Sequence, residues 1–166
     1  MILRALRHLF TPFWIAPRRF GAPLLAQIAQ RIADAEQRRP GELRFVVEHA
    51  LDIGDVLFRR VTPRQRALEL FSLLRVWDTE HNTGILIHVL LADRAVEIVA
   101  DRGIAARVPQ PQWDLLCRNA QTAFREQRYA EGSLALIDGA ARLLESSFPA
   151  SLPKKPNELP DQPLLL

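Results

Sequence analysis

The sequence predicts a three-layer α/β/α sandwich built around a small mixed sheet, and three observations support this fold class. A strand, a helix and a second strand follow one another between residues 42 and 92, which predicts a β-α-β unit with parallel strands. Residues 84–92 are apolar at nearly every position, as in an inner strand covered by helices on both faces. Only Asp93 and Arg94 separate this strand from the next, which predicts an antiparallel hairpin.

The first helix and the first strand differ in the spacing of their apolar residues. Residues 22–38 carry apolar side chains at about every fourth position, which predicts an amphipathic helix, and Pro40-Gly41 is expected to stop it. Apolar side chains then recur at every second position from Leu43, so residues 42–50 are predicted to form a strand. A connection rich in turn residues follows.

The second helix has a clear signature at its beginning. Thr62 is a good N-cap, Pro63 suits the first helical position, and Gln65 can complete a capping box. The apolar side of this helix is expected to run as far as Trp77, and the helix to end near Asp78.

Three further elements and an arm complete the chain. Residues 95–100 are predicted to be the third strand, and apolar stripes predict helices over 112–127 and 129–148. The last 18 residues contain five prolines, so an extended arm is expected there. The predicted organisation is therefore an N-terminal amphipathic segment over 1–19, one domain over 20–148 and a proline-rich arm over 149–166.

The N-terminal segment, residues 1–17, has two sides of different character. Leu3, Leu6 and Phe10 make an apolar stripe, while Arg4, Arg7 and His8 make a basic side. A signal peptide would need a longer apolar core and a small-residue cleavage site, and residues 1–17 are not expected to be one because they show neither. Two interpretations stay open: a short helix packed against the domain, which we favour, and peripheral contact with a membrane surface.

The composition excludes several classes of protein. With 22 basic and 19 acidic residues the net charge is only +3, and the arginines come in scattered pairs without interleaved aromatics, so no nucleic-acid partner is expected. No run reaches the roughly 18 apolar residues of a spanning helix. Cys117 is the single cysteine, which suits a reducing compartment and a structural thiol. We expect a cytoplasmic protein, with peripheral contact at the inner membrane if residues 1–17 bind lipid.

The predicted hairpin groups polar residues at one end of the sheet. Because its strands are antiparallel, the end of strand 95–100 lies beside the start of strand 84–92. Asp101 should therefore lie near the loop that contains Asp78, Glu80 and Asn82.

Oxygen-rich side chains at one sheet end predict a candidate site for Ca²⁺ or Mg²⁺. Its ligands would be Asp78, Glu80, Asn82 and Asp101. A solvated turn held by local hydrogen bonds is the alternative, and we favour it. His81, in the same loop, is the candidate for acid or base chemistry, whereas His88 in the inner strand is expected to be a core residue.

The stretch from Arg75 to Ile104 resembles the core of the TPM domain family. That family is named for a thylakoid lumen protein, a photosystem II repair protein and a nematode receptor modulator. The helix, loop, Gly84-Ile-Leu-Ile strand and hairpin all match, and the compact bacterial branch of uncharacterised proteins is the nearer match. Glu36–Glu48 resembles the first strand of that branch, and Asn157–Pro163 resembles its closing tail.

The resemblance carries implications for fold and chemistry. It implies a compact α/β sandwich, a phosphatase activity ascribed to the plant lumen member, and metal binding ascribed to some bacterial members. The matching positions are Asp78, Asn82 and Asp101, but Asp101-Arg102-Gly103 departs from a segment that is often glycine-rich in the family. Bacterial TPM proteins often accompany LemA-like membrane-associated proteins, which implies a membrane-protein partner of that kind.

Three functional hypotheses follow, and the sequence leaves all of them open. The first is a non-enzymatic interaction module linked to membrane or envelope proteins. The second is a metal-assisted phosphate-ester hydrolase, with Asp78 and Asp101 as ligands and His81 as acid or base. The third is a module that binds a divalent metal ion without turnover.

Overall fold

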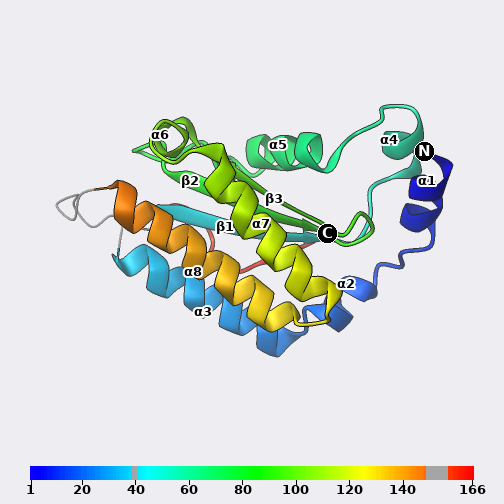
Figure 1. The fold of residues 1–166 in the computed structure, drawn as a ribbon, viewed down its shortest axis with the longest axis horizontal. Coiled ribbons are helices and arrows are strands. Elements are labelled where there is room, and N and C mark those ends of the chain that lie inside the picture. Colours follow the sequence, from blue (N-terminus) through cyan, green and yellow to red (C-terminus); the bar gives the residue numbers. More distant parts are fainter. Residues whose placement is uncertain (39–40, 149–156) are drawn as a thin grey trace.

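The sheet has four strands in the order β3-β2-β1-β4. The computed structural model describes residues 1–38, 41–148 and 157–166 (Figure 1). Its strands are β1 (Glu42–Glu48), β2 (Gly84–Leu90), β3 (Ala95–Ala100) and β4 (Leu164–Leu165). β1 runs parallel to β2 and to β4, and β2 runs antiparallel to β3. The predicted mixed sheet is therefore confirmed, and it has one more strand than the sequence indicated.

Three helices cover one face of the sheet (Figure 1). They are α3 (Ala22–Arg38), α7 (Gln110–Arg125) and α8 (Tyr129–Ser147). Because strand side chains alternate between faces, the odd-numbered residues Phe45, Ile85 and Ile87 enter the core under these helices.

The even-numbered residues of the same strands enter a second core on the other face. Val46 and Leu86 pack there against α5 (Pro63–Leu73), together with Leu159 near the C-terminus. A third cluster lies beside it, under α1 (Ile2–Leu9) and α4 (Ile53–Leu57). Helices thus cover both faces, every residue of β2 is buried, and the predicted α/β/α sandwich is confirmed.

The beginning of α5 is as predicted, but its end is not. Thr62 accepts a hydrogen bond from the Gln65 N–H and donates its own N–H to the Gln65 side chain, which completes the capping box. The helix ends at Leu73, before the predicted Asp78, because Arg75 adopts a left-handed φ of 52°. The chain then closes in a Schellman motif, in which the Val76 N–H donates to the Phe71 carbonyl.

This early ending changes which side chain enters the core. Val76 is fully buried, whereas Trp77, predicted to lie on the apolar stripe, is half-exposed. The turn of the hairpin is also longer than the two residues predicted. Leu90 pairs with Ala95, so four residues connect β2 to β3.

Three short helices were not predicted, because each is too short to show a helical period in the sequence. They are α2 (Ile15–Arg19), α4 and α6 (Arg102–Ala105). The longer helices α7 and α8 begin and end within two residues of the predicted bounds.

The C-terminal residues 157–166 dock on the domain and add β4 to the sheet, so they are not only an extended arm. The Leu166 N–H donates to the Val47 carbonyl, and the His49 N–H donates to the Leu166 carbonyl. Arg44 donates to the carbonyl oxygens of Pro160 and Gln162. Residues 149–156 of the predicted arm lie outside the described residues.

Candidate functional site

The structure brings two of the four predicted ligand residues into one corner. Asp101 is the N-cap of α6, and its Oδ1 atom accepts the Arg102 N–H at 2.6 Å. The Arg102 side chain reaches back, and its Nε donates to Asn82 Oδ1 at 2.9 Å. Arg102 therefore links Asn82 before β2 to Asp101 after β3, as the hairpin topology predicted.

Close backbone contacts fix the shape of this corner. A Cβ atom on Gly103 would lie 2.6 Å from the Asn82 carbonyl oxygen and 2.9 Å from that of His81. Only glycine lets the first turn of α6 approach the loop so closely. Asn82 itself has a left-handed φ of 54°, a conformation that asparagine tolerates better than most residues.

The other two predicted ligands do not join this corner. Asp78 and Glu80 are exposed, and the Glu80 backbone N–H donates to the Glu158 carboxylate at 3.0 Å. Within residues 1–38, 41–148 and 157–166, no three histidine, cysteine or acidic side chains gather closely enough to hold a metal ion.

Two polar atoms at this end are buried without a hydrogen-bond partner among the described residues. They are Asp101 Oδ2 and His81 Nε2. An unpartnered carboxylate oxygen favours a bound cation or water, because its burial is otherwise costly. Acid or base catalysis by His81 would need an orienting group. In the part of the chain that the structure describes, no hydrogen bond orients its Nε2.

The opposite end of β2 holds an ionic anchor that the sequence did not reveal. The Asp93 side chain is only 6% exposed. Arg4 donates hydrogen bonds to its carboxylate from Nε at 3.0 Å and from a terminal nitrogen at 2.6 Å. His8 Nδ1 accepts the Leu51 N–H, which places the ring proton on Nε2, 3.1 Å from Asp93 Oδ1. Burial alone would raise the Asp93 pKa, but hydrogen bonds from Arg4 and His8 outweigh it and hold the pKa below its usual range.

This anchor decides how α1 is oriented. The helix does pack against the domain, as favoured, but through Arg4, Ala5 and His8. Its apolar stripe faces outward, with Leu3 79% and Phe10 76% exposed. Further large apolar side chains of the same segment are exposed: Met1, Ile2, Leu6, Leu9, Phe13 and Trp14. We call this surface the N-terminal apolar face.

A second buried ionic network ties α5 to the sheet. Glu48 at the end of β1 accepts hydrogen bonds from Arg66 of α5 at 2.7 Å and from His88 of β2 at 3.1 Å. Burial raises the Glu48 pKa, but the His88 and Arg66 hydrogen bonds outweigh it, so the pKa is lowered. His88 is therefore the core residue that the sequence predicted. The pairing of His88 with Glu48 could have been predicted from the sequence, because the parallel register of β1 and β2 puts both residues on one face of the sheet.

Cys117 is buried under β3, as expected of a structural thiol. Burial, with smaller contributions from Glu97 and Asp114, raises the pKa of its thiol to about 12. The thiolate that a nucleophile or a metal ligand requires is therefore disfavoured at neutral pH.

The fold agrees with comparisons to known proteins. The TPM domain family model matches residues 22–143, more than half of the chain. The BA42 protein from the psychrophilic bacterium Bizionia argentinensis is similar at 26% sequence identity and a TM-score of 0.74, over 87% of this chain and 93% of that one. The N-terminal domain of a P. gingivalis protein shares the fold at 22% identity and a TM-score of 0.56, over 71% of each chain. No curated protein matches the chain. The chain therefore belongs to the TPM domain family.

Proposed function

We propose that this TPM domain is a non-enzymatic module that attaches to the surface of an anionic lipid bilayer through its N-terminal apolar face. The outward orientation of Leu3 and Phe10 supports this proposal most directly, because large apolar side chains exposed together on one segment mark an interaction site. None of the described helices is long and apolar enough to cross a membrane. The attachment proposed here is peripheral.

The charge around the N-terminal apolar face favours lipid over other apolar surfaces. Of the five arginines among the first 33 residues, Arg4 and Arg7 pair with Asp93 and Arg31 pairs with Asp138. Arg18 and Arg19 have no acidic partner among the described residues. Arg18 is exposed beside Trp14 and Phe13, two aromatic side chains of the kind that lie at a lipid headgroup boundary. Arg4 pairs with the buried Asp93, and the exposed Arg7 lies 3.5 Å from the same carboxylate, so the apolar stripe is presented by a helix that is held in place.

Vesicle cosedimentation tests this proposal. We expect the wild type to sediment with vesicles containing phosphatidylglycerol, and the double variant Leu3→Ser/Phe10→Ser to lose most of this binding. Leu73→Ser is the control, because Leu73 is 71% exposed on a different helix, and it should bind like the wild type. The proposal is contradicted if the double variant binds vesicles as well as the wild type does, or if the wild type does not bind vesicles of pure lipid. The second result leaves a LemA-like membrane-protein partner as the expectation to test.

A second candidate function, binding of Ca²⁺ or Mg²⁺, rests on the unpartnered Asp101 Oδ2 atom. Asp101 supplies a carboxylate oxygen, and Asn82 Oδ1 keeps a lone pair after accepting from Arg102. These side chains supply oxygens of the kind that a hard cation takes, and the exposed Asp78 and Glu80 do not gather into a site among the described residues. A cation bound here would neutralise the buried Asp101 carboxylate. Metal-assisted hydrolysis with His81 as acid or base stays a prediction.

A thermal melt with added CaCl₂ or MgCl₂ tests this second candidate. A site in the native state raises the midpoint with cation concentration. We expect such a rise in the wild type and not in Asp101→Asn, which keeps the N-cap and removes the charge. Asp114→Asn, an exposed aspartate of α7, should respond like the wild type. An equal rise in all three proteins would mean that Asp101 holds no cation.

A further inference from the structure

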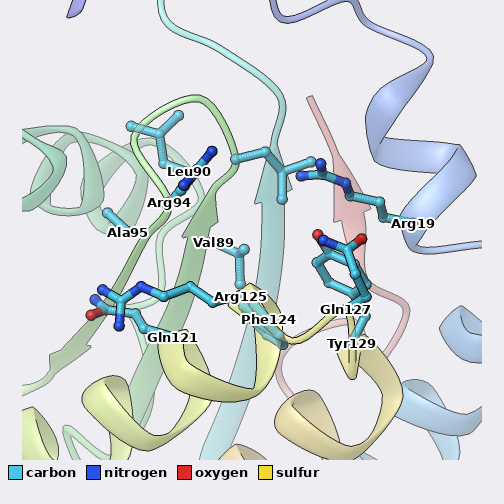
Figure 2. Close-up of a pocket in the computed structure, with 11 residues that line it drawn as sticks. Arg19, Val89, Leu90, Arg94, Ala95, Gln121, Phe124, Arg125, Gln127 and Tyr129 are labelled. Atoms are coloured by element: carbon cyan, nitrogen blue, oxygen red, sulfur yellow. The ribbon is translucent and has the colours of Figure 1, made fainter. Parts of the chain in front are cut away.

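We infer that a pocket between α2, α7 and the β2–β3 hairpin binds a small phosphate-bearing anion. The pocket has a volume of about 140 Å³ (Figure 2). Three arginines line it, Arg19 from α2, Arg94 from the hairpin turn and Arg125 from the end of α7. In Figure 2, Arg19 and Arg94 reach toward the pocket from opposite sides.

The three guanidinium groups have no carboxylate partner among the described residues. The Arg19 guanidinium lies over the Tyr129 ring, 5.3 Å from its centroid, which holds the side chain and leaves its N–H groups able to donate. The salt bridges of the described residues involve other arginines, and none involves Arg19, Arg94 or Arg125. The pocket is therefore lined by three cations that no acidic side chain neutralises.

The nearby acidic side chains are already engaged elsewhere. Asp93 is adjacent to Arg94 in the sequence, but Arg4, Arg7 and His8 hold its carboxylate. Glu126 lies between the pocket residues Arg125 and Gln127 in the sequence, and both Glu126 and Glu131 pair with Arg128. The acids near these arginines are thus turned to other cations, and the positive potential of the pocket is left for a ligand.

Two turns fix the positions of two lining residues. Arg94 and Gln127 have left-handed φ values of 53° and 62°. At Gln127 this conformation ends α7 in a Schellman motif, in which the Arg128 N–H donates to the Ala123 carbonyl. The lining also includes Val89, Leu90 and Leu91, at the carboxyl end of β2, where ligands bind in open α/β sheets.

Size and chemistry define the ligand class. The volume is well below the roughly 300 Å³ of a pocket for a drug-sized molecule, so the ligand is small. Arginine forks match phosphate oxygens, and a dianion balances three guanidiniums better than a monoanion does. Phe124 and Val89 give the wall an apolar part, which suits a phosphate monoester with a short carbon chain.

Nuclear magnetic resonance of the ¹⁵N-labelled full chain tests the inference, with inorganic phosphate and glycerol 3-phosphate as probes at constant ionic strength. We expect saturable shifts of the Arg94 and Gln127 amides. The double variant Arg94→Gln/Arg125→Gln should weaken binding by about tenfold or more, since each lost partner is charged. Arg118→Gln removes one arginine charge from α7 outside the lining and should bind normally.

Vesicles separate a free phosphate from a lipid headgroup as the source. Cosedimentation with phosphatidic acid vesicles, lost in the Arg94/Arg125 double variant without any response to soluble phosphate, would identify a headgroup. A response to soluble phosphate identifies a free ligand. Absence of both, equal weakening in Arg118→Gln, or acetate binding as tightly as phosphate overturns the inference. Leu3→Ser/Phe10→Ser should leave phosphate binding unchanged. The result for membrane attachment is therefore independent of the result for the phosphate pocket.

Discussion

At the scale of single residues, Gly84 shows how closely the loop before β2 follows the end of α5. A Cβ atom placed on Gly84 would lie 1.8 Å from the Val76 carbonyl oxygen, a backbone atom that cannot turn aside as a side chain can. The Schellman motif at Arg75 turns Val76 into this position and buries its side chain. Packing against Val76 therefore explains why a glycine begins the Gly84-Ile-Leu-Ile segment, which resembles the TPM family. No ligand is needed to account for it.

Gly84→Ala is expected to destabilise the protein by about 3 kcal/mol or more, because the backbone must move to admit the methyl group. Gly54→Ala is the matched control. A Cβ on Gly54 meets nothing within 4 Å, and the residue lies in a helix, so that change should be neutral or slightly stabilising. Urea unfolding measures both. Similar stability of the two variants would mean that Val76 and Gly84 are not in contact in solution.

At the scale of elements, the C-terminal residues 157–166 act as a strap across the α5 face. β4 extends the sheet beside β1, and Leu159 is buried in the core with Val46 and Leu86. Glu42 accepts the N–H groups of Glu158 and Leu159, which fixes the start of this strap. The strap therefore contributes core surface as well as a strand.

Leu159→Ala should cost about 2 to 3 kcal/mol, because it removes a buried side chain and leaves a cavity. Leu166→Ala, at a position 39% exposed, should cost less than about 1 kcal/mol. Urea midpoints of the two variants check this difference. Equal, small losses would show that residues 157–166 do not dock as described.

At the scale of the whole molecule, local patterns predicted elements, while their long-range partners escaped prediction. The Thr62 capping box, the alternation around Phe45 and the hairpin after β2 are each encoded within a few residues. The side of α1 that faces inward depends on Asp93, 89 residues along the chain from Arg4. Periodicity identifies the two sides of a helix but does not show which one is buried, because that depends on the partner.

The candidate sites follow the same rule. The approach of Asn82 to Asp101 was predictable, since antiparallel pairing across one hairpin requires it. The exposure of Asp78 was not, because loop conformation depends on close contacts such as Gly103 against the Asn82 carbonyl. The arginine pocket draws on segments far apart in the sequence, and its net charge depends on which acids pair elsewhere. Neither property is visible in a local pattern.

The pH dependence of stability also belongs to the whole molecule, because carboxylates at its two ends have opposite pKa shifts. Asp93 and Glu48 have lowered pKa values, so the stability that they provide is present above their unfolded pKa and is lost as pH falls through the folded pKa. Burial raises the pKa of Glu36 to about 9, against a hydrogen bond from the Leu43 N–H and with Glu42 and Asp161 adding to the rise. Its contribution is fully present below the unfolded value of 4.5 and is lost as pH rises toward 9.

We therefore expect the free energy of unfolding to rise from pH 3 to about pH 5 and to decline from there to pH 9. Glu36→Gln keeps an oxygen to accept the Leu43 N–H and an amide to face Asp161, but it has no proton to lose. This variant should flatten the alkaline decline and leave the acid limb unchanged. Gln37→Glu, an exposed neighbour on α3, adds a carboxylate without burial and should keep the wild-type profile. Urea unfolding from pH 3 to pH 9 measures all three proteins, and an equally steep alkaline decline in Glu36→Gln would show that Glu36 ionises normally in the folded state.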